Sequence, residues 1–261
     1  HMLSVFSVAC AGLAAAGIKS VTLAEALDDR LQHMKIVTPE AVTPAGLATA
    51  QYLAALPEMA HGTRDVLCSD SLCALTMAAC GSRVTAFHAT GDEARAEALQ
   101  KTAESQKLRV ATSSFDLMAE AAPLPIVGKE KKYYGDSTGN ANLLIFADVL
   151  SDEPSAKRMS VVVSEAVQLG AWVILADHAP SPWRKTFLEL LEHELRYVDC
   201  GHPHFDDEFI VEQPELGWEA EPVALLRLNA PMFAAALNTG YGSLEERRGF
   251  ELPPPTVQLV D

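Results

Sequence analysis

Residues 65–92 constrain the fold more than any other part of the chain, because strand-like and helix-like segments alternate there over a short distance. Residues 66–68 form a short β-rich run, residues 72–80 are small and mostly apolar, and residues 84–87 are β-rich again. A strand, a helix and a second strand in this order make a βαβ unit, the repeating piece of a parallel sheet. The segment therefore predicts an α/β fold of the type that binds nucleotides at the carboxyl ends of its strands.

The turn between the first strand and the helix of this unit reads Ser69-Asp70-Ser71-Leu72 and contains no glycine. In nucleotide sites, glycines let this turn tighten and approach the ligand without a Cβ in the way. Here side chains fill that space, and Asp70 adds a negative charge. Asp and Ser at a helix start can instead bond the free amides of the first turn, which is the alternative role for these residues. The turn thus predicts weak cofactor binding on a cofactor-type fold.

The rest of the chain repeats the alternation of strands and helices. Unbroken apolar runs such as Leu143 to Phe146 indicate strands buried on both faces of a sheet, and two closing strands without a helix between them predict an antiparallel edge. We expect a doubly wound, mostly parallel, Rossmann-like sheet of seven strands, with residues 1–43 as an N-terminal extension and residues 44–261 as the domain. The expected strands are 65–68, 84–87, 108–112, 142–148, 171–177, 195–200 and 222–229, and the expected helices are 44–57, 72–80, 93–105, 155–169 and 182–194.

Composition narrows the classes of function. A chain of 261 residues that is 49% hydrophobic can bury a sizeable core. With 35 acids against 20 bases the net charge is −15, which disfavours nucleic acid and favours a basic protein partner. Five cysteines without a CxxC pair predict reduced thiols in an intracellular compartment.

Residues 2–18 are apolar but carry no positive charge and are short for a membrane span. We expect them to form a packed helix or arm, with a signal peptide or a mitochondrial presequence as alternatives. The corresponding location is cytoplasmic, with mitochondrial as the alternative, and no association with a membrane is expected.

Three segments together resemble a known enzyme superfamily. Residues 44–58, 146–152 (Phe-Ala-Asp-Val-Leu-Ser-Asp) and 173–182 (Val-Ile-Leu-Ala-Asp-His-Ala-Pro-Ser-Pro) are similar, in order and spacing, to segments of the class I, seven-β-strand methyltransferases that depend on S-adenosylmethionine. Within that superfamily the chain is most similar to the protein-lysine methyltransferases of the electron-transfer-flavoprotein-β type. The resemblance covers roughly residues 34–229. It implies S-adenosylmethionine as the cofactor and a protein side chain, lysine, as the methyl acceptor.

The same resemblance implies positions for the cofactor. Residues 69–71 lie near its methionine part, and Asp116 lies near the place where the family holds the adenine amine. At the end of the second strand, where the family has an acid for the ribose hydroxyls, this chain has His88. Asp92, at the start of the next helix, is a second candidate for that contact. The alternative for His88 is an ordinary polar residue at a strand end.

Asp148 is the residue that the resemblance assigns to catalysis. In the family a Tyr follows this Asp three residues on, and the pair orients the target amine; here that position holds Ser151. A carboxylate can accept a hydrogen bond from an ammonium group and position the deprotonated amine for attack. The alternative role is a cap on the following helix. We predict a methyltransferase acting on a protein side chain, with a catalytically degenerate protein that serves as a binding or assembly scaffold as the alternative.

Sequence motifs for metal binding or for a catalytic nucleophile give little support to other classes of function. His202, His204 and Asp206 alternate as a strand would present them, which is the pattern behind a metal-site alternative. Gly201 and Pro203 favour a loop instead, and the spacing matches no zinc signature, so we predict no metal. The chain also lacks a Gly-x-Ser-x-Gly elbow, a His-Glu-x-x-His motif and a phosphate-binding loop.

Overall fold

The computed structural model describes residues 20–22, 29–55, 65–115, 143–168, 171–178, 181–196, 203–213 and 218–228. Its centre is one seven-stranded sheet with the order β5-β4-β3-β6-β7-β9-β8. The first five strands of that order are parallel, and β9 and β8 are antiparallel to their neighbours. This is the Rossmann-like methyltransferase fold, as predicted. The strands are β3 (Asp65–Cys68), β4 (Arg83–His88), β5 (Val110–Ser114), β6 (Leu143–Ala147), β7 (Trp172–His178), β8 (Phe205–Gln213) and β9 (Trp218–Leu228).

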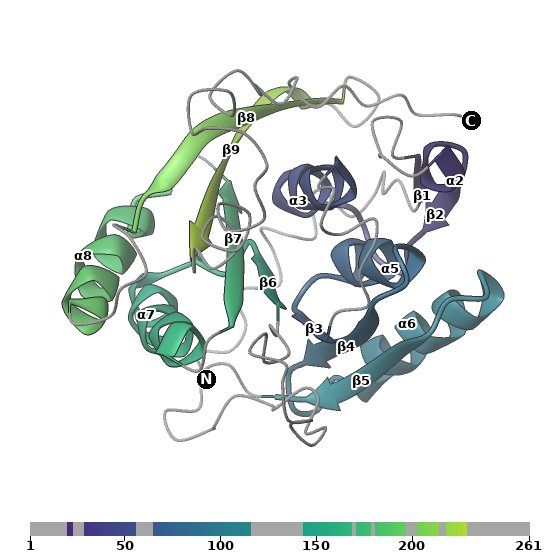
Figure 1. Cartoon of the computed structure of the whole chain (residues 1–261), viewed down its shortest axis with the longest axis horizontal. Helices are drawn as coiled ribbons and strands as arrows, with labels where there is room; N and C mark the ends of the chain where they lie inside the picture. Colours follow the sequence, from purple (N-terminus) through teal and green to yellow (C-terminus); the bar gives the residue numbers. More distant parts are fainter. Residues whose placement is uncertain are drawn as a thin grey trace, which may run out of the picture.

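Helices cover both faces of the sheet (Figure 1). Two separate clusters of buried side chains lie between the helices and the strands. Because successive side chains of a strand point to opposite faces, Val66 packs with the first cluster and Leu67 with the second. Helices α3 (Pro44–Ala55), α5 (Ser71–Ala79) and α6 (Glu93–Ser105) cover one face, and α7 (Glu153–Gln168) and α8 (Trp183–Leu195) cover the other.

A second, small sheet precedes the main one. Strands β1 (Ser20–Thr22) and β2 (Lys35–Val37) pair antiparallel, with the short helix α2 (Asp29–Gln32) between them. The side-chain amide of Gln106, at the end of α6, bonds the backbone N–H and the carbonyl of Val37, each at 2.8 Å. These two bonds fix β2 to helix α6 of the main domain.

The predicted strand at 195–200 is wrong for residues 195 and 196, the part of it that the structure describes. Leu195 is the last residue of α8 and Arg196 is its C-cap, while residues 197–200 lie outside the described residues. The seventh strand is instead β8, whose sequence FDDEFIVEQ contains four acidic residues. An edge strand tolerates charged residues, because one side of it is not paired, and so it lacks the apolar run that marks a central strand.

Several sequence predictions fall on residues outside the described ranges, among them the N-terminal run 2–18, Asp116 and His202. The division at residue 43 also stays a prediction. Among the described residues, no helix is long and apolar enough to cross a membrane, and no group of three metal-ligating side chains is found. The described cysteines, Cys68, Cys73 and Cys80, are buried free thiols, as predicted.

Candidate functional site

The candidate site lies at the carboxyl ends of β3 and β6, where the helices that follow the two strands go to opposite faces of the sheet. Ligands of open α/β sheets bind in the crevice at such a switch point. Ser69 joins the two strand ends here. Its N–H donates to the carbonyl of Ile145 at 3.0 Å, and its Oγ accepts from the N–H of Ala147 at 3.2 Å.

Asp70 caps the helix that follows the turn. It has extended backbone angles, and its Oδ1 accepts a hydrogen bond from the N–H of Cys73 at 2.8 Å. Burial raises the pKa of Asp70 and the charge of Glu40 adds to this effect, while the bonds from Cys73 oppose it. The alternative role weighed for this turn, helix capping, is therefore present. The Cys73 amide at this helix start is therefore already occupied and is not available to a bound anion.

A glycine does lie at this site, but it belongs to helix α3 rather than to the turn. A Cβ added at Gly46 would lie 2.9 Å from Oδ2 of Asp70 and 3.1 Å from Oγ1 of Thr43. The backbone of Gly46 also accepts from Sγ of Cys73 at 3.4 Å. Helix α3 therefore packs tightly against the capped turn, because position 46 carries no side chain.

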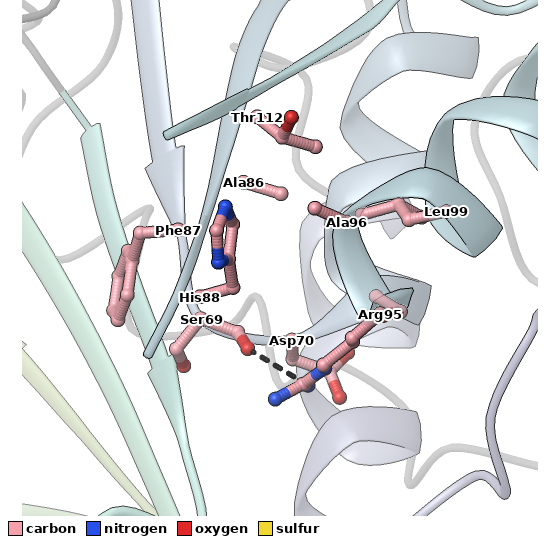
Figure 2. Close-up of a pocket in the computed structure, with 10 residues that line it drawn as sticks. Ser69, Asp70, Ala86, Phe87, His88, Arg95, Ala96, Leu99 and Thr112 are labelled. Atoms are coloured by element: carbon pink, nitrogen blue, oxygen red, sulfur yellow. Dashed lines mark hydrogen bonds between the residues drawn. The ribbon is translucent and has the colours of Figure 1, made fainter. Parts of the chain in front are cut away.

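Arg95 reaches from α6 across to the turn, as Figure 2 shows. Its Nε donates to Oε1 of Glu40 at 2.5 Å, and one terminal nitrogen donates to the carbonyl of Ser69 at 3.5 Å. The same Glu40 oxygen accepts from Oγ of Ser71 at 3.1 Å. Burial lowers the pKa of Arg95, but Glu40 and the charge of Asp70 outweigh burial and the pKa is raised.

Behind Arg95 lies a recess with a cavity volume of about 10 Å³. That is the space needed by about one water molecule. Sites that bind cofactors or other small molecules usually measure roughly 300–1,000 Å³. The recess is lined by Ser69, Asp70, Ser71, Ala86, Phe87, His88, Arg95, Ala96, Leu99 and Thr112.

His88 forms part of the wall of this recess at the end of β4. It is buried, and its Nδ1 lies 3.0 Å from the carbonyl oxygen of Ala89. Asp92, the second candidate for a ribose contact, stands at the N-cap of α6 but makes no capping hydrogen bond with its side chain. Its charge helps to raise the pKa of Arg95. The predicted contacts of these two residues with a cofactor stay predictions.

Asp148 occupies the other half of the site, at the end of β6. It is exposed and has a φ of 54°, a left-handed conformation that strains most residues other than glycine. Its N–H donates to the carbonyl of Ala176 at 3.0 Å. The capping alternative for Asp148 is wrong, because Oδ1 of Asp152 accepts from the N–H of Ser155 at the start of α7.

The acids at this edge repel one another. Although Asp148 is exposed as a residue, its carboxyl group loses hydration to the surrounding protein, and this raises its pKa; the charge of Asp70 adds to the effect, while a hydrogen bond with Thr43 lowers it. Burial and the charge of Asp148 raise the pKa of Asp177 to about 6. Nε of Arg184 lies 3.9 Å from Oδ2 of Asp177, and within the described part of the chain that oxygen has no hydrogen-bond partner. The edge therefore carries closely spaced negative charge.

Sequence reasoning missed Glu40, Gly46 and Arg95. Glu40 and Arg95 are 55 residues apart, so no local pattern joins them. The sequence did contain one signal for the role of Arg95. Arg95 is the third residue of α6, and a cation near a helix N-terminus is disfavoured by the helix dipole unless an acid compensates it.

No family model matches the chain, and a search of curated protein sequences finds no relative. Solved structures do share its fold. A TehB-like, S-adenosylmethionine-dependent methyltransferase from Corynebacterium glutamicum is 13% identical with a TM-score of 0.42, and the match covers 70% of this chain and 88% of that one. The N-methyltransferase NodS from Bradyrhizobium japonicum, in complex with S-adenosyl-L-homocysteine, is 11% identical with a TM-score of 0.42, over 79% and 95% of the two chains. These likenesses are distant, and the strand order defines the fold.

S-adenosylmethionine does not fit the described residues of the turn. The carboxylate of Asp70 holds the helix-start amide of Cys73. Arg95 closes the adjoining recess, which has space for about one water. The described conformation therefore keeps the Cys73 amide occupied and leaves little volume in the adjoining recess.

Proposed function

We propose that this chain uses a methyltransferase-type fold as a binding scaffold for a protein partner and does not depend on S-adenosylmethionine. The observation that carries the proposal is the cap made by Asp70 on the N–H of Cys73. A bound carboxylate would have to displace this cap and would then meet a like charge. Near-contact like charges can weaken a micromolar site to roughly millimolar affinity.

The partner proposed for the scaffold is a protein with a basic surface. The net charge of −15 supports this choice, because summed charge steers association with partners of opposite sign. The carboxylates of Asp148 and Asp177 add to the negative potential at the carboxyl edge of the sheet.

A protein-lysine methyltransferase is the second candidate, and the geometry of Asp148 favours it. This exposed carboxylate stands at the carboxyl end of β6 with a strained backbone and is not used to cap α7. Strained residues that protein structure maintains are concentrated at functional sites. In this role Asp148 would accept a hydrogen bond from a lysine ammonium and orient it. Asp148→Asn should then keep the fold and lower turnover by about 10²-fold or more.

Thermal unfolding with and without cofactor separates the two candidates. A ligand at 100 times its Kd stabilises a protein by about 2.7 kcal/mol, which is several degrees in Tm for a chain of this size. The scaffold predicts a shift below about 1 °C with 1 mM S-adenosylmethionine or S-adenosylhomocysteine. A shift of several degrees with either compound would contradict the scaffold and favour the enzyme.

A further inference from the structure

The two border strands of the sheet differ in how they are protected against pairing with a further strand. Figure 1 shows β5 at one border, beyond β4, and β8 at the other. The sequence of β8, FDDEFIVEQ, contains four acidic residues, and its pairing with β9 has two irregularities of register. Charged residues and bulges are common means of preventing a border strand from pairing with another chain. The β8 border is therefore protected.

Strand β5 has none of these features. Its sequence, VATSS, contains no charged residue and no proline, and its register with β4 is regular over the whole strand. Among the described residues, no strand pairs with the outer side of β5. Ala111 and Ser114 are exposed, and the rest of the strand is partly exposed. An open border of this kind is a template on which another strand can form hydrogen bonds.

The backbone groups that β5 offers follow from its pairing with β4. The N–H of Phe115, directly after β5, donates to the carbonyl of His88 in β4 at 2.9 Å. Along a strand, the N–H and C=O groups of every second residue point to the same side. Residues 111 and 113 therefore bond β4 as Phe115 does. The remaining residues of β5 direct their N–H and C=O groups away from the sheet: Val110, Thr112 and Ser114.

We propose that β5 is an interface between two copies of this chain, whose β5 strands pair antiparallel across a two-fold axis at Thr112. In this register Thr112 lies opposite Thr112 of the second copy, and Val110 lies opposite Ser114. Every residue with outward backbone groups then meets another such residue, so each pair can exchange both of its hydrogen bonds. The pairing uses the open border of both copies, so the assembly closes as a dimer. This inference goes beyond the proposed function and does not depend on whether the chain binds a cofactor.

A second copy suits this border better than a partner recognised by its charge, because residues 110–114 carry no charge. The same residue types on both sides also allow hydroxyl groups to meet across the axis, which favours strand pairing. Arg109, directly before the strand, is exposed. In the antiparallel pair the two Arg109 residues lie about 20 Å apart, at ~3.4 Å per residue. The screening length is about 8 Å at physiological ionic strength, so their repulsion is small.

Analytical ultracentrifugation of the wild type, Thr112→Pro and Thr112→Ala tests the interface. Proline at position 112 removes an N–H that points outward, so it blocks the pairing without removing a bond to β4. Thr112→Ala is the matched control. It also loses the hydroxyl that accepts from Nε2 of Gln100 at 2.9 Å, but it keeps the backbone N–H.

We expect the wild type and Thr112→Ala to form a reversible dimer with a Kd on the order of 10–100 µM, since an interface of this size gives weak association. Thr112→Pro should dimerise at least about tenfold more weakly. A wild type that stays monomeric well above this concentration range would overturn the proposal. A dimer that Thr112→Pro leaves unchanged would overturn it as well, because the copies would then meet at another surface.

Disulfide cross-linking tests the register and decides the question if Thr112→Pro does not fold. Thr112→Cys places two thiols opposite each other at the axis, with Cα atoms about 5.5 Å apart, which is within the range for a disulfide. Ser114→Cys is the matched control, because it places the thiols about 14 Å apart along the strands. We expect mild oxidation to link Thr112→Cys into dimers and to leave Ser114→Cys at the level of the wild type. No linked dimer from Thr112→Cys, or equal linking of both variants, would overturn the interface.

Discussion

The two halves of the candidate site differ in how their polar groups are satisfied. On the side of β3, which includes Asp70 and Arg95, the charged groups are paired with a helix amide, with Glu40 and with a carbonyl. On the side of β6 and β7, Asp148 has a strained backbone and Asp177 keeps a buried oxygen without a hydrogen bond. The first half is organised as interior structure, while the second retains a strained backbone and a buried polar atom without a hydrogen bond among the described residues, features that are typical of functional sites.

The comparison teaches that two strand ends of one sheet can satisfy their polar groups in different ways. The cap that Asp70 makes on Cys73 and the bond between Arg95 and Glu40 hold α3, α5 and α6 together in the described conformation, although burial raises the pKa of Asp70. Asp148 and Asp177 cost stability, because their charges are partly buried and repel each other. Substitutions in the two halves should therefore change the free energy of unfolding in opposite directions.

The largest expected effect is at Asp177. A carboxyl whose pKa is raised from 3.8 to about 6 costs the folded state about 3 kcal/mol once it is ionised. The folded state binds the proton more tightly than the unfolded state, so stability falls as the pH rises from about 4 to about 6. Asp177→Asn should raise the free energy of unfolding by up to about 3 kcal/mol at pH 7.5 and change it little at pH 4. Denaturant titrations at the two pH values measure this.

A matched control for that prediction is Asp65→Asn. Asp65 is also buried at an end of a strand, but its Oδ1 lies 2.7 Å from Nε of Arg83. Removing a paired charge should lower stability rather than raise it. If Asp177→Asn also lowers stability at pH 7.5, the account of an unsatisfied acid on the β7 side is wrong.

A smaller effect of opposite sign is expected at Asp70. Asp70→Ala removes the cap on Cys73 and should lower the free energy of unfolding by about 1.5 kcal/mol. The same substitution should make Gly46→Ala more tolerable, since Oδ2 of Asp70 lies 2.9 Å from the position of the new Cβ. A double-mutant cycle measured by chemical unfolding checks both statements. Additive effects would show that α3 and the turn are not coupled.

The smallest effect is expected at Asp148. Asp148→Gly relieves a left-handed backbone and removes a repelled charge, so it should stabilise the protein by about 1 kcal/mol. Lys107→Gly is the control for the backbone alone, because Lys107 also has a positive φ, of 60°, but lies far along the chain at the end of α6. A loss of stability in Asp148→Gly would mean that its carboxylate makes a net favourable contact.

Local patterns predicted most of the fold. Apolar runs marked β6 and β7, and the small-residue segment after β3 marked α5. The strand β8 was missed because its charged residues suit an edge, where burial does not impose an apolar pattern. The predicted cap at Asp70 needed only the identity of residues at a helix start.

The site was less predictable than the fold, for a physical reason. The bond between Glu40 and Arg95 joins residues far apart in sequence, and the contact of Gly46 with Asp70 depends on how α3 packs. The pKa of Asp177 depends on burial and on Asp148, which only tertiary structure brings near it. Asp116 lies outside the described residues, so its predicted role stays a prediction.

The central claim is that Asp70 prevents the turn from accepting the cofactor, and calorimetric titration with S-adenosylmethionine tests it most directly. The wild type should bind with a Kd near millimolar or show no heat, and Asp70→Gly should bind measurably more tightly, because it removes both the charge and the cap. A wild-type Kd near micromolar would contradict the account and identify the chain as a cofactor-binding enzyme.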